Sequence, residues 1–479
     1  MRRLRARLRR TARRRSGVVG QGCPRPLSLR RGGDRGRGHR ARDRPRRAAA
    51  DGGFRRSGPG VPDRPGRRHR PARARARRRV ILVRVRRQLG GAGARERRVS
   101  AARVYVRAAG AVAAAGTGIP SLLRAVGDPD WQPVLGLTRP DAPPLPVAVC
   151  REFTTKDIVP PLLARRLDRP SRLLAVAARE ALRAAGDPLP WAIERVGVTA
   201  GTWNAGTSAL VEVLRAVFLT SPDEAPPAQF PSTVANAPAS QLGILDKLGG
   251  PNITFAEKQV GGLRAVAEAA RMLLARRADA VAACGVDEGD WLNAEGYARL
   301  GALASPGRAG MVLGEGAGVL VLARDPGSGP LAALAGWGSA SAPAPPHRYP
   351  AEPQALVAAC AQALARAGMA ATEVDLVVSV ANGIPALATL ELAAMDTVFG
   401  GHRPAAVGVA DRLGEGAAGG ALRAVIAALT VAGAVLPAWD CPPHLAAAGY
   451  RTVACRPRTA LVGGVAGGGS AVALVFTAA

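Results

Sequence analysis

The sequence PNITFAEKQVGGLRAVAEAARMLLARRADAVAACGVDE occupies residues 251–288. Its strand-like NITF turns sharply, at AEKQVGG, into an apolar helix. A side chain at that turn lies against the N–H groups and the positive dipole end of the helix, which would lower the pKa of a cysteine nucleophile. The residue at this position is Gln259. The turn therefore offers the place of a nucleophile without the thiol.

Outward from this stretch, the chain repeats one plan twice. In each repeat an apolar helix precedes a strand and a glycine, and later a glycine-opened helix and a glycine-rich turn into a strand follow. The first repeat has these elements at residues 173–186, 195–201, 261–266 (GGLRAV) and 314–322 (GEGAGVLVL), and the second at 355–368, 374–383, 419–425 (GGALRAV) and 467–476 (GGGSAVALVF). We therefore predict an internally duplicated chain.

Helices that alternate with nearly continuous apolar strands predict an α/β protein whose buried sheets are covered by helices. The predicted halves are residues 101–330 and 331–479. We place their boundary near residues 326–346, where Gly, Pro, Ser and Ala cluster.

The first hundred residues differ from the rest. They hold 36 of the 67 basic residues, all Arg, and five of the 35 acidic ones, so they carry nearly all of the net charge of +32. We expect a disordered or non-native extension over residues 1–100. A polybasic arm for nucleic acid or anionic lipid and a transit peptide are alternatives. Coding bias with a misplaced start or a frameshift explains the tract better, so we predict no nucleic-acid or membrane partner.

Several other signals indicate no chemistry. The glycines of GEGAG at residues 314–318 lead into a strand rather than a helix, so we predict close backbone packing rather than phosphate binding. His347, His402 and His444 stand beside or near Pro or Gly, as in surface loops. The six cysteines lack the spacing of a zinc site or a disulfide framework. We expect no metal and no cofactor.

The longest apolar run, residues 424–439, is interrupted by Thr430 and Pro437 and is too short to span a bilayer. We predict a buried helix there. Widely spaced cysteines without a disulfide pattern favour a cytoplasmic protein.

The segment 251–288 resembles the nucleophile segment of the β-ketoacyl synthases. The matching segments continue in order along residues 102–479, and in combination they are specific: ARVYVRAAGAV (102–112), LLARRLDRPSRLLAVAAREAL (162–182), FPSTVANAPASQLGILDKLGGPN (230–252), GMVLGEGAGVLVL (310–322) and the final GGGSAVALVF. The resemblance implies a thiolase-like fold, with layers in the order αβαβα and two related halves.

In that family a cysteine takes the acyl chain from an acyl carrier protein, and two histidines assist decarboxylation and stabilise the developing negative charge. On the resemblance, the cysteine position matches Gln259 and the first histidine matches Asn382. The second histidine matches Leu413 or Glu415, depending on a two-residue gap. A family lysine upstream of it has no match, and the aromatic gate falls at Gly467. All three catalytic positions are therefore expected to be degenerate.

A glutamine in place of the cysteine is typical of chain-length factors, the inactive partners of type II polyketide ketosynthases. The resemblance implies a heterodimer with an active ketosynthase, in which this subunit shapes the tunnel for a polyketide, fatty-acid-type or polyene chain carried by an acyl carrier protein. Family members meet their partner along residues 199–209, which include Trp203, and along the helix after Gln259. Ordinary core packing is an equally good interpretation of Trp203.

An enzyme with altered chemistry is the alternative hypothesis, either a malonyl-carrier-protein decarboxylase or an acyltransferase. Decarboxylases of this kind keep the histidine pair, which is absent here. Glu257, Lys258 and Glu415 are the ionisable candidates near the turn, and a desolvated Lys258 could act as a nucleophile. Glu257 and Lys258 could equally be solvated or paired with each other. A structural or nucleic-acid-binding role through the basic arm is a third hypothesis.

Overall fold

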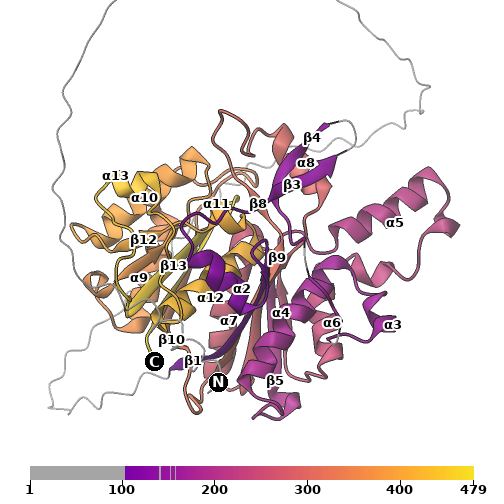
Figure 1. Cartoon of the computed structure of the whole chain (residues 1–479), viewed down its shortest axis with the longest axis horizontal. Coiled ribbons are helices and arrows are strands. Elements are labelled where there is room, and N and C mark those ends of the chain that lie inside the picture. Colours follow the sequence, from indigo (N-terminus) through magenta and orange to yellow (C-terminus); the bar gives the residue numbers. More distant parts are fainter. Residues whose placement is uncertain (1–102, 140–141, 152, 157) are drawn as a thin grey trace, which may run out of the picture. The chain divides into compact units, whose positions relative to one another are not determined.

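The computed structural model describes residues 103–139, 142–151, 153–156 and 158–479 (Figure 1). The extension predicted for residues 1–100 lies outside the described residues. The strands are β1 Val104–Ala113, β2 Gly116–Thr117, β3 Leu135–Arg139, β4 Ala142–Ala148, β5 Val196–Gly201, β6 Asn252–Phe255, β7 Ala280–Asp287, β8 Leu313–Gly314, β9 Gly316–Ala323, β10 Ala332–Ser341, β11 Leu376–Val378, β12 Ala405–Val407, β13 Thr459–Val465 and β14 Ser470–Thr477. The helices are α2 Ile119–Val126, α3 Pro161–Ala164, α4 Arg169–Ala185, α5 Thr207–Leu219, α6 Ala237–Leu245, α7 Gly261–Leu274, α8 Trp291–Arg299, α9 Gln354–Ala367, α10 Pro385–Phe399, α11 Ala410–Leu413, α12 Ala417–Val431 and α13 Pro443–Ala447.

The large sheet is symmetric about its centre. Within the described residues its strand order is β12-β11-β13-β14-β10-β1-β9-β7-β5-β6, with β2 paired beside β1. Outward from the central β1–β10 pair, β1-β9-β7-β5-β6 on one side corresponds to β10-β14-β13-β11-β12 on the other. On each side the first two pairings are antiparallel and the next two are parallel. This correspondence confirms the predicted duplication.

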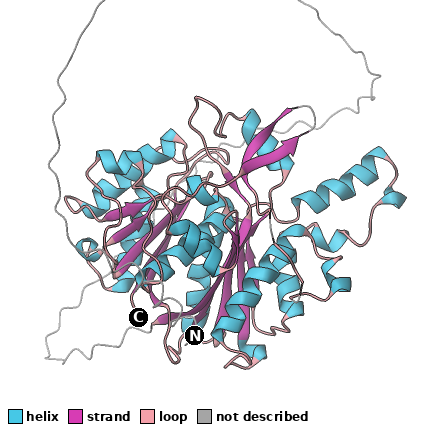
Figure 2. Ribbon diagram, viewed as in Figure 1, coloured by secondary structure: helices cyan, strands magenta, loops and turns pink. Residues whose placement is uncertain are grey.

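Helices separate the two halves of the sheet and cover them. The helices α7 and α12 contact each other and strands of both halves, so they form a central layer. On the outer faces, α4 lies against β1 and β9, and α9 lies against β10 and β14. Figures 1 and 2 show α7 and α12 between α9 on one side and α4 on the other. The predicted layered α/β architecture is confirmed.

Strands in the middle of the sheet are buried on both faces. Val281 of β7 packs with Leu263 of α7 in the central core, whereas its neighbour Ala282 packs with Leu173 of α4 in the outer core. Because successive side chains of a strand point to opposite faces, both sets must be apolar when helices cover both faces. This arrangement explains why the strands appear in the sequence as nearly continuous apolar runs.

The glycines of the GEGAG segment allow close backbone packing, as predicted. A Cβ on Gly316, whose φ is +150°, would lie 2.4 Å from the carbonyl oxygen of Val112, and one on Gly318 would lie 2.9 Å from the backbone nitrogen of Leu422 in α12. Contacts below 3.0 Å leave no room for a side chain. These glycines therefore hold β9 against β1 and the central helix.

Two local predictions are wrong. The helix expected over residues 424–439 ends with α12 at Val431, because Gly433 adopts a φ of +73° and its N–H bonds back to Thr430. His444 lies in α13 rather than in a surface loop, and it is half-buried. Among the described residues, no helix combines the length and apolarity that crossing a membrane requires.

Candidate functional site

Gln259 lies at the turn between β6 and α7, as the sequence predicts. The turn is a 3-10 helix, Lys258–Val260, in which Lys258 has a φ of +52°, a conformation that is uncommon for residues with a side chain. The Gln259 side chain is buried. Its Nε2 donates to the hydroxyl of Tyr349 at 3.2 Å, and its Oε1 accepts from the N–H of Gly467 at 3.4 Å. The amide is thus held at both ends.

Asn382 and Gln259 meet at the same tyrosine. Asn382 follows β11 and is buried. Its Nδ2 lies 2.8 Å from the Tyr349 hydroxyl and 3.1 Å from Oε2 of Glu415, and both of these oxygens accept from it. The Tyr349 hydroxyl therefore joins two of the positions that the resemblance assigns to catalysis, although it comes from the loop between β10 and α9.

Of the two residues proposed for the second histidine position, the structure places Glu415 beside Asn382 and Leu413 in the hydrophobic core. Glu415 lies between α11 and α12, and its Oε1 accepts from Arg423 at 3.0 Å. The side chains of Glu415 and Arg423 are 1% and 2% exposed, respectively. Arg423 also donates to the carbonyl of Ser379, while its Nε has no partner. The site therefore contains a fully buried ion pair.

Burial dominates the electrostatics of the site. It raises the pKa of Glu415, and the Arg423 guanidinium opposes this rise by stabilising the carboxylate. Burial also raises the pKa of the Tyr349 phenol, and the charge of Glu415 raises it further, so the phenol stays protonated. The side chains that meet here are two amides, a phenol, a carboxylate and a guanidinium. None of them is a thiol that could act as a nucleophile, and none is an imidazole that could act as a general acid.

The two charges before Gln259 have separate partners. Glu257 accepts from Arg264 at 3.1 Å, so it does not pair with Lys258. The Lys258 ammonium donates to the backbone carbonyls of Pro346 and of Gly467, the latter at 3.1 Å. Burial lowers the pKa of Lys258. The lysine thus fastens the 346 and 467 loops over the turn that carries Gln259.

A small cavity lies beside Glu415. A cavity of about 20 Å³ is lined by residues that include Trp203, Asp287, Glu288 and Glu415, which is room for about one water molecule. Trp203 packs edge-on against Tyr297, with ring centroids 5.1 Å apart. No group of three or more His, Cys, Asp or Glu side chains in the described part of the chain is arranged to hold a metal ion.

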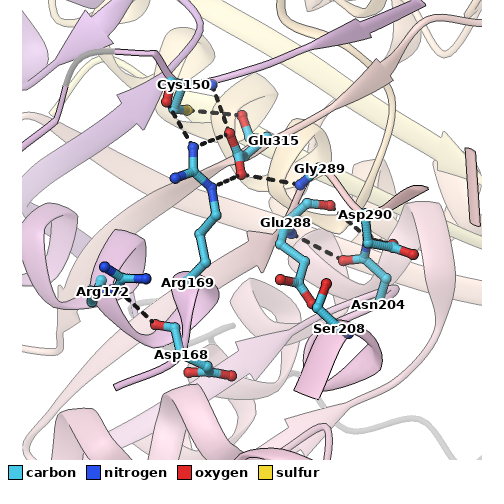
Figure 3. Close-up of polar contacts among 10 residues, drawn as sticks. All are labelled: Cys150, Asp168, Arg169, Arg172, Asn204, Ser208, Glu288, Gly289, Asp290 and Glu315. Atoms are coloured by element: carbon cyan, nitrogen blue, oxygen red, sulfur yellow. Dashed lines mark hydrogen bonds and ion pairs between the residues drawn. The ribbon is translucent and has the colours of Figure 1, made fainter. Parts of the chain in front are cut away.

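A second buried polar cluster surrounds Glu315 of the GEGAG segment (Figure 3). Both oxygens of Glu315 accept from the Arg169 guanidinium, and they also accept the N–H groups of Cys150 and Gly289. Arg169 further donates to the carbonyl of Cys150 at 2.8 Å. Burial raises the pKa of the Cys150 thiol well above its usual range, so this cysteine is not a reactive thiolate.

Next to it, Glu288, Asn204 and Asp290 form a connected group. Asn204 donates to the carbonyl of Glu288 at 2.7 Å and to the carboxylate of Asp290 at 2.6 Å. The carboxylate of Glu288 accepts the N–H of Ser208 at 3.1 Å. Burial, and the nearby charge of Asp290, raise the pKa of Glu288 to about 7. This group fastens the 204–208 turn to the end of β7.

Tyr349 and Arg423 are two residues of the network that the sequence does not predict. Arg423 had a visible signal, because it is the only charged residue in the otherwise apolar run of α12 and a buried charge needs a partner. Tyr349 had none, since it lies in the irregular loop APAPPHRYP, whose path depends on contacts distant in the sequence.

Two family models match the chain: "Beta-ketoacyl synthase, N-terminal domain" over residues 156–326 and "Beta-ketoacyl synthase, C-terminal domain" over residues 331–439. The chain belongs to the β-ketoacyl synthase family, and its fold is the thiolase-like fold of that family. It is similar to the 3-oxoacyl-[acyl-carrier-protein] synthase 2 of Coxiella burnetii, with 27% identity over 304 residues, which are 57% of this chain and 73% of the relative.

Among solved structures, the ishigamide ketosynthase/chain length factor matches with a TM-score of 0.69 and 20% identity, over 79% of this chain and 99% of that one. A ketosynthase (ApeO) in complex with its chain length factor (ApeC) from Xenorhabdus doucetiae matches with a TM-score of 0.65 and 19% identity, over 79% and 98% of the two chains. At these identities the matches show a shared fold.

Proposed function

We propose that this protein is a chain-length-factor-like subunit, catalytically inactive alone, that pairs with an active ketosynthase. The observation that carries the proposal is the filled site, in which Gln259, Tyr349, Asn382, Glu415 and Arg423 form one buried hydrogen-bonded network. A carboxamide cannot form the thioester that carries an acyl chain in the family. At the position that the resemblance gives to the nucleophile, the network holds a buried amide.

The charge at the site also opposes catalysis of condensation. Stabilising the negative charge that develops on a thioester oxygen requires hydrogen-bond donors aimed at it. Here the carboxylate of Glu415 lies 3.1 Å from Asn382 and occupies one of the amide's two donor positions, and Tyr349 occupies the other. A carboxylate at this position would repel the developing anion, so the arrangement is better suited to structure than to acyl transfer.

The proposed partner would be bound at the end of the sheet. Strand β6 pairs only with β5 within the described strands, so its outer edge is free. The helix α6 lies next to β6. The segments from α5 to α6 expose large apolar side chains, which we call the α5 patch: Leu210, Leu214, Phe218, Leu219, Phe230, Val234 and Ile244. Figure 1 shows α5 extending away from the sheet. A free strand edge beside an apolar patch is typical of an association surface.

The resemblance and the fold matches supply the identity of the proposed partner. Two of the matched structures are described as combining a ketosynthase with a chain length factor, and a third is a type II polyketide synthase ketosynthase in complex with its acyl carrier protein. We propose that a ketosynthase with an intact cysteine and two histidines covers the α5 patch. This subunit then helps to set how far the chain on the carrier protein extends.

Absence of acylation is the first test of the proposal. The full chain is incubated with acyl and malonyl thioesters of an acyl carrier protein, and intact-mass spectrometry follows the protein while chromatography follows the products. We expect no covalent adduct and no condensed product. A stable acyl adduct on the chain, or release of a condensed product by the chain alone, contradicts the proposal.

The α5 patch gives a second test with a matched control. Phe218 is 77% exposed on α5, and Leu162 is 78% exposed on α3. Phe218→Asp is expected to abolish or strongly weaken association with the ketosynthase partner, because a charge cannot be buried in an apolar interface without a counter-charge. Leu162→Asp is expected to leave association unchanged. If the two variants associated equally well with the ketosynthase, the interface would lie elsewhere.

Acylation of Lys258 is the second candidate function, since burial lowers the pKa of its amine and so favours a nucleophilic form. Its ammonium, however, donates to two backbone carbonyls, and a neutral amine would lose part of these interactions. Peptide mapping after the thioester incubation separates the candidates, because only this function predicts an acyl group on Lys258.

A further inference from the structure

A cavity of about 440 Å³ lies on the C-terminal half, separate from the filled site. We call it the Trp439 pocket, and its apolar wall is formed by residues that include Ile384, Pro385, Trp439, Pro442 and Pro443. It passes Ala381 and Gly383, which flank Asn382, but none of the residues of the buried network line it. A volume of this size with a mainly apolar lining is typical of small-molecule sites.

The side chain of His444, which lines the pocket, is bonded to a buried carboxylate. The Nε2 of His444 lies 2.8 Å from a carboxylate oxygen of Glu391, whose side chain is 0% exposed. Because a carboxylate only accepts, Nε2 carries the proton. Glu391 also accepts from the Ser379 hydroxyl and from the N–H of Val380. The imidazole is therefore fixed in orientation, and its Nδ1 has no hydrogen-bond partner among the described residues.

The charged groups at the pocket are mostly negative. Asp411 and Asp440 line it and are exposed, and Glu391 lies behind His444. Arg412 is the fixed positive charge; it lies 3.8 Å from Asp411, donates to the carbonyl of Trp131 and stacks on the Trp439 ring. The charged and ionisable groups at the pocket are therefore three carboxylates, those of Asp411, Asp440 and Glu391, one guanidinium and one imidazole. The pocket carries a net negative charge whether the imidazole is neutral or protonated.

Burial raises the pKa of the remaining ionisable lining group, the Cys441 thiol, to about 11, so this thiol adds no charge near neutral pH. An apolar wall with a negative rim complements a molecule that has an apolar body and one positive charge. The neutral form of His444 adds a fixed acceptor, Nδ1, for an N–H group of the same molecule.

We propose that the Trp439 pocket binds small amphipathic primary amines, whose apolar part lies against Ile384, Pro385 and Pro443 and whose ammonium group lies among Asp411, Asp440 and His444. This site is independent of the proposed partner role and of the filled site, because it uses none of their residues. It would give the subunit a ligand of its own.

The test compares two probes of the same shape and opposite charge, 4-phenylbutylamine and 4-phenylbutyrate, by isothermal titration calorimetry on the full chain. We expect the amine to bind and the acid to bind at least tenfold more weakly. Asp411→Asn combined with Asp440→Asn is expected to weaken the amine about two- to fivefold, which is the range for removing partly exposed ion pairs. Both aspartates are exposed, so these changes leave the fold intact.

Asp396→Asn is the matched control, since Asp396 is an exposed carboxylate that pairs with Arg403 outside the pocket; it should leave the affinity of the amine unchanged. Binding of the acid as tightly as the amine would overturn the proposal. If neither probe gave a heat of binding at millimolar concentration, the proposal would also be overturned. The same holds if the amine bound the double variant and the parent chain with equal affinity.

Discussion

Two segments with the sequence Leu-Gly-Glu-Gly, residues 313–316 and 413–416, lie side by side. The N–H of Gly314 bonds to the carbonyl of Glu415, and the N–H of Glu415 bonds to that of Val312. Each segment buries a glutamate that pairs with an arginine. Glu315 receives its arginine and two backbone N–H groups, and Arg169 keeps a side chain that is 34% exposed. The first pair therefore retains contact with water.

The second pair, Glu415 and Arg423, loses more of its hydration. Glu415 and Arg423 are both nearly inaccessible, and the Nε of Arg423 has no partner. Removing two charges from water is costly unless every polar atom is satisfied. The first pair therefore joins segments where water still reaches the arginine, whereas the second lies fully buried in the network around Asn382.

The largest expected effect comes from breaking the buried pair. Arg423→Met leaves the charge of Glu415 without compensation, and we expect the free energy of unfolding to fall by about 3–5 kcal/mol. Urea denaturation of the purified chain measures the loss. The double variant Glu415→Gln with Arg423→Met should recover most of it, because neither partner is then left charged and alone. A single variant as stable as the parent chain would contradict the buried pair.

The cluster of Figure 3 predicts a dependence of stability on pH. The pKa of Glu288 rises from 4.5 to about 7 on folding, so the folded chain binds this proton more tightly than the unfolded chain. The contribution of Glu288 to stability is therefore lost as the pH rises from about 4.5 to about 7, by up to about 3 kcal/mol. Urea unfolding at pH 5 and pH 7.5 should show a smaller loss for Glu288→Gln than for the parent; equal losses would rule out the shift.

A smaller effect is expected at the tyrosine that joins the two amides. Tyr349→Phe removes the acceptor shared by Gln259 and Asn382, and we expect a loss of about 1–3 kcal/mol because two buried donors lose a partner. Thermal unfolding measures it. Tyr105→Phe provides a control on a tyrosine of β1. If both changes cost the same, the network at the site has no special role.

The smallest effect is expected from restoring the thiol alone. Gln259→Cys should give no condensation, because neither Asn382 nor the candidates for the second position, Leu413 and Glu415, is a histidine and the thiol would be buried without a base. Product analysis with acyl and malonyl carrier-protein thioesters checks this result. Detectable condensed product would overturn the account of the site.

Much of the fold followed from the sequence because each helix and strand carries its own period. The turn at Gln259 and the close packing at Gly316 and Gly318 were local properties of the chain. The duplication could be predicted because the halves retain the same order of elements. The end of the helix in the apolar run 424–439 could not be predicted, because the conformation of Gly433, not hydrophobicity, ends it.

The site could be predicted only in part. Gln259 and Asn382 stand in recognisable segments, but the choice between Leu413 and Glu415 depended on a gap that spacing cannot resolve. The structure brings Glu415 to Asn382 because Arg423, two turns into α12, pairs with it. Tyr349 arrives from an irregular loop, and the partner of His444 lies 53 positions earlier in the chain. Contacts of this kind arise from tertiary packing and leave no local pattern.

The most direct test of the central claim is purification of the tagged full chain from its native host, with mass-spectrometric identification and quantification of whatever co-purifies. We predict a ketosynthase with an intact cysteine and histidine pair, recovered in equal amount. Recovery of a homodimer of this chain alone, carrying acyl groups or forming product, would contradict the claim that it is the inactive partner of another subunit.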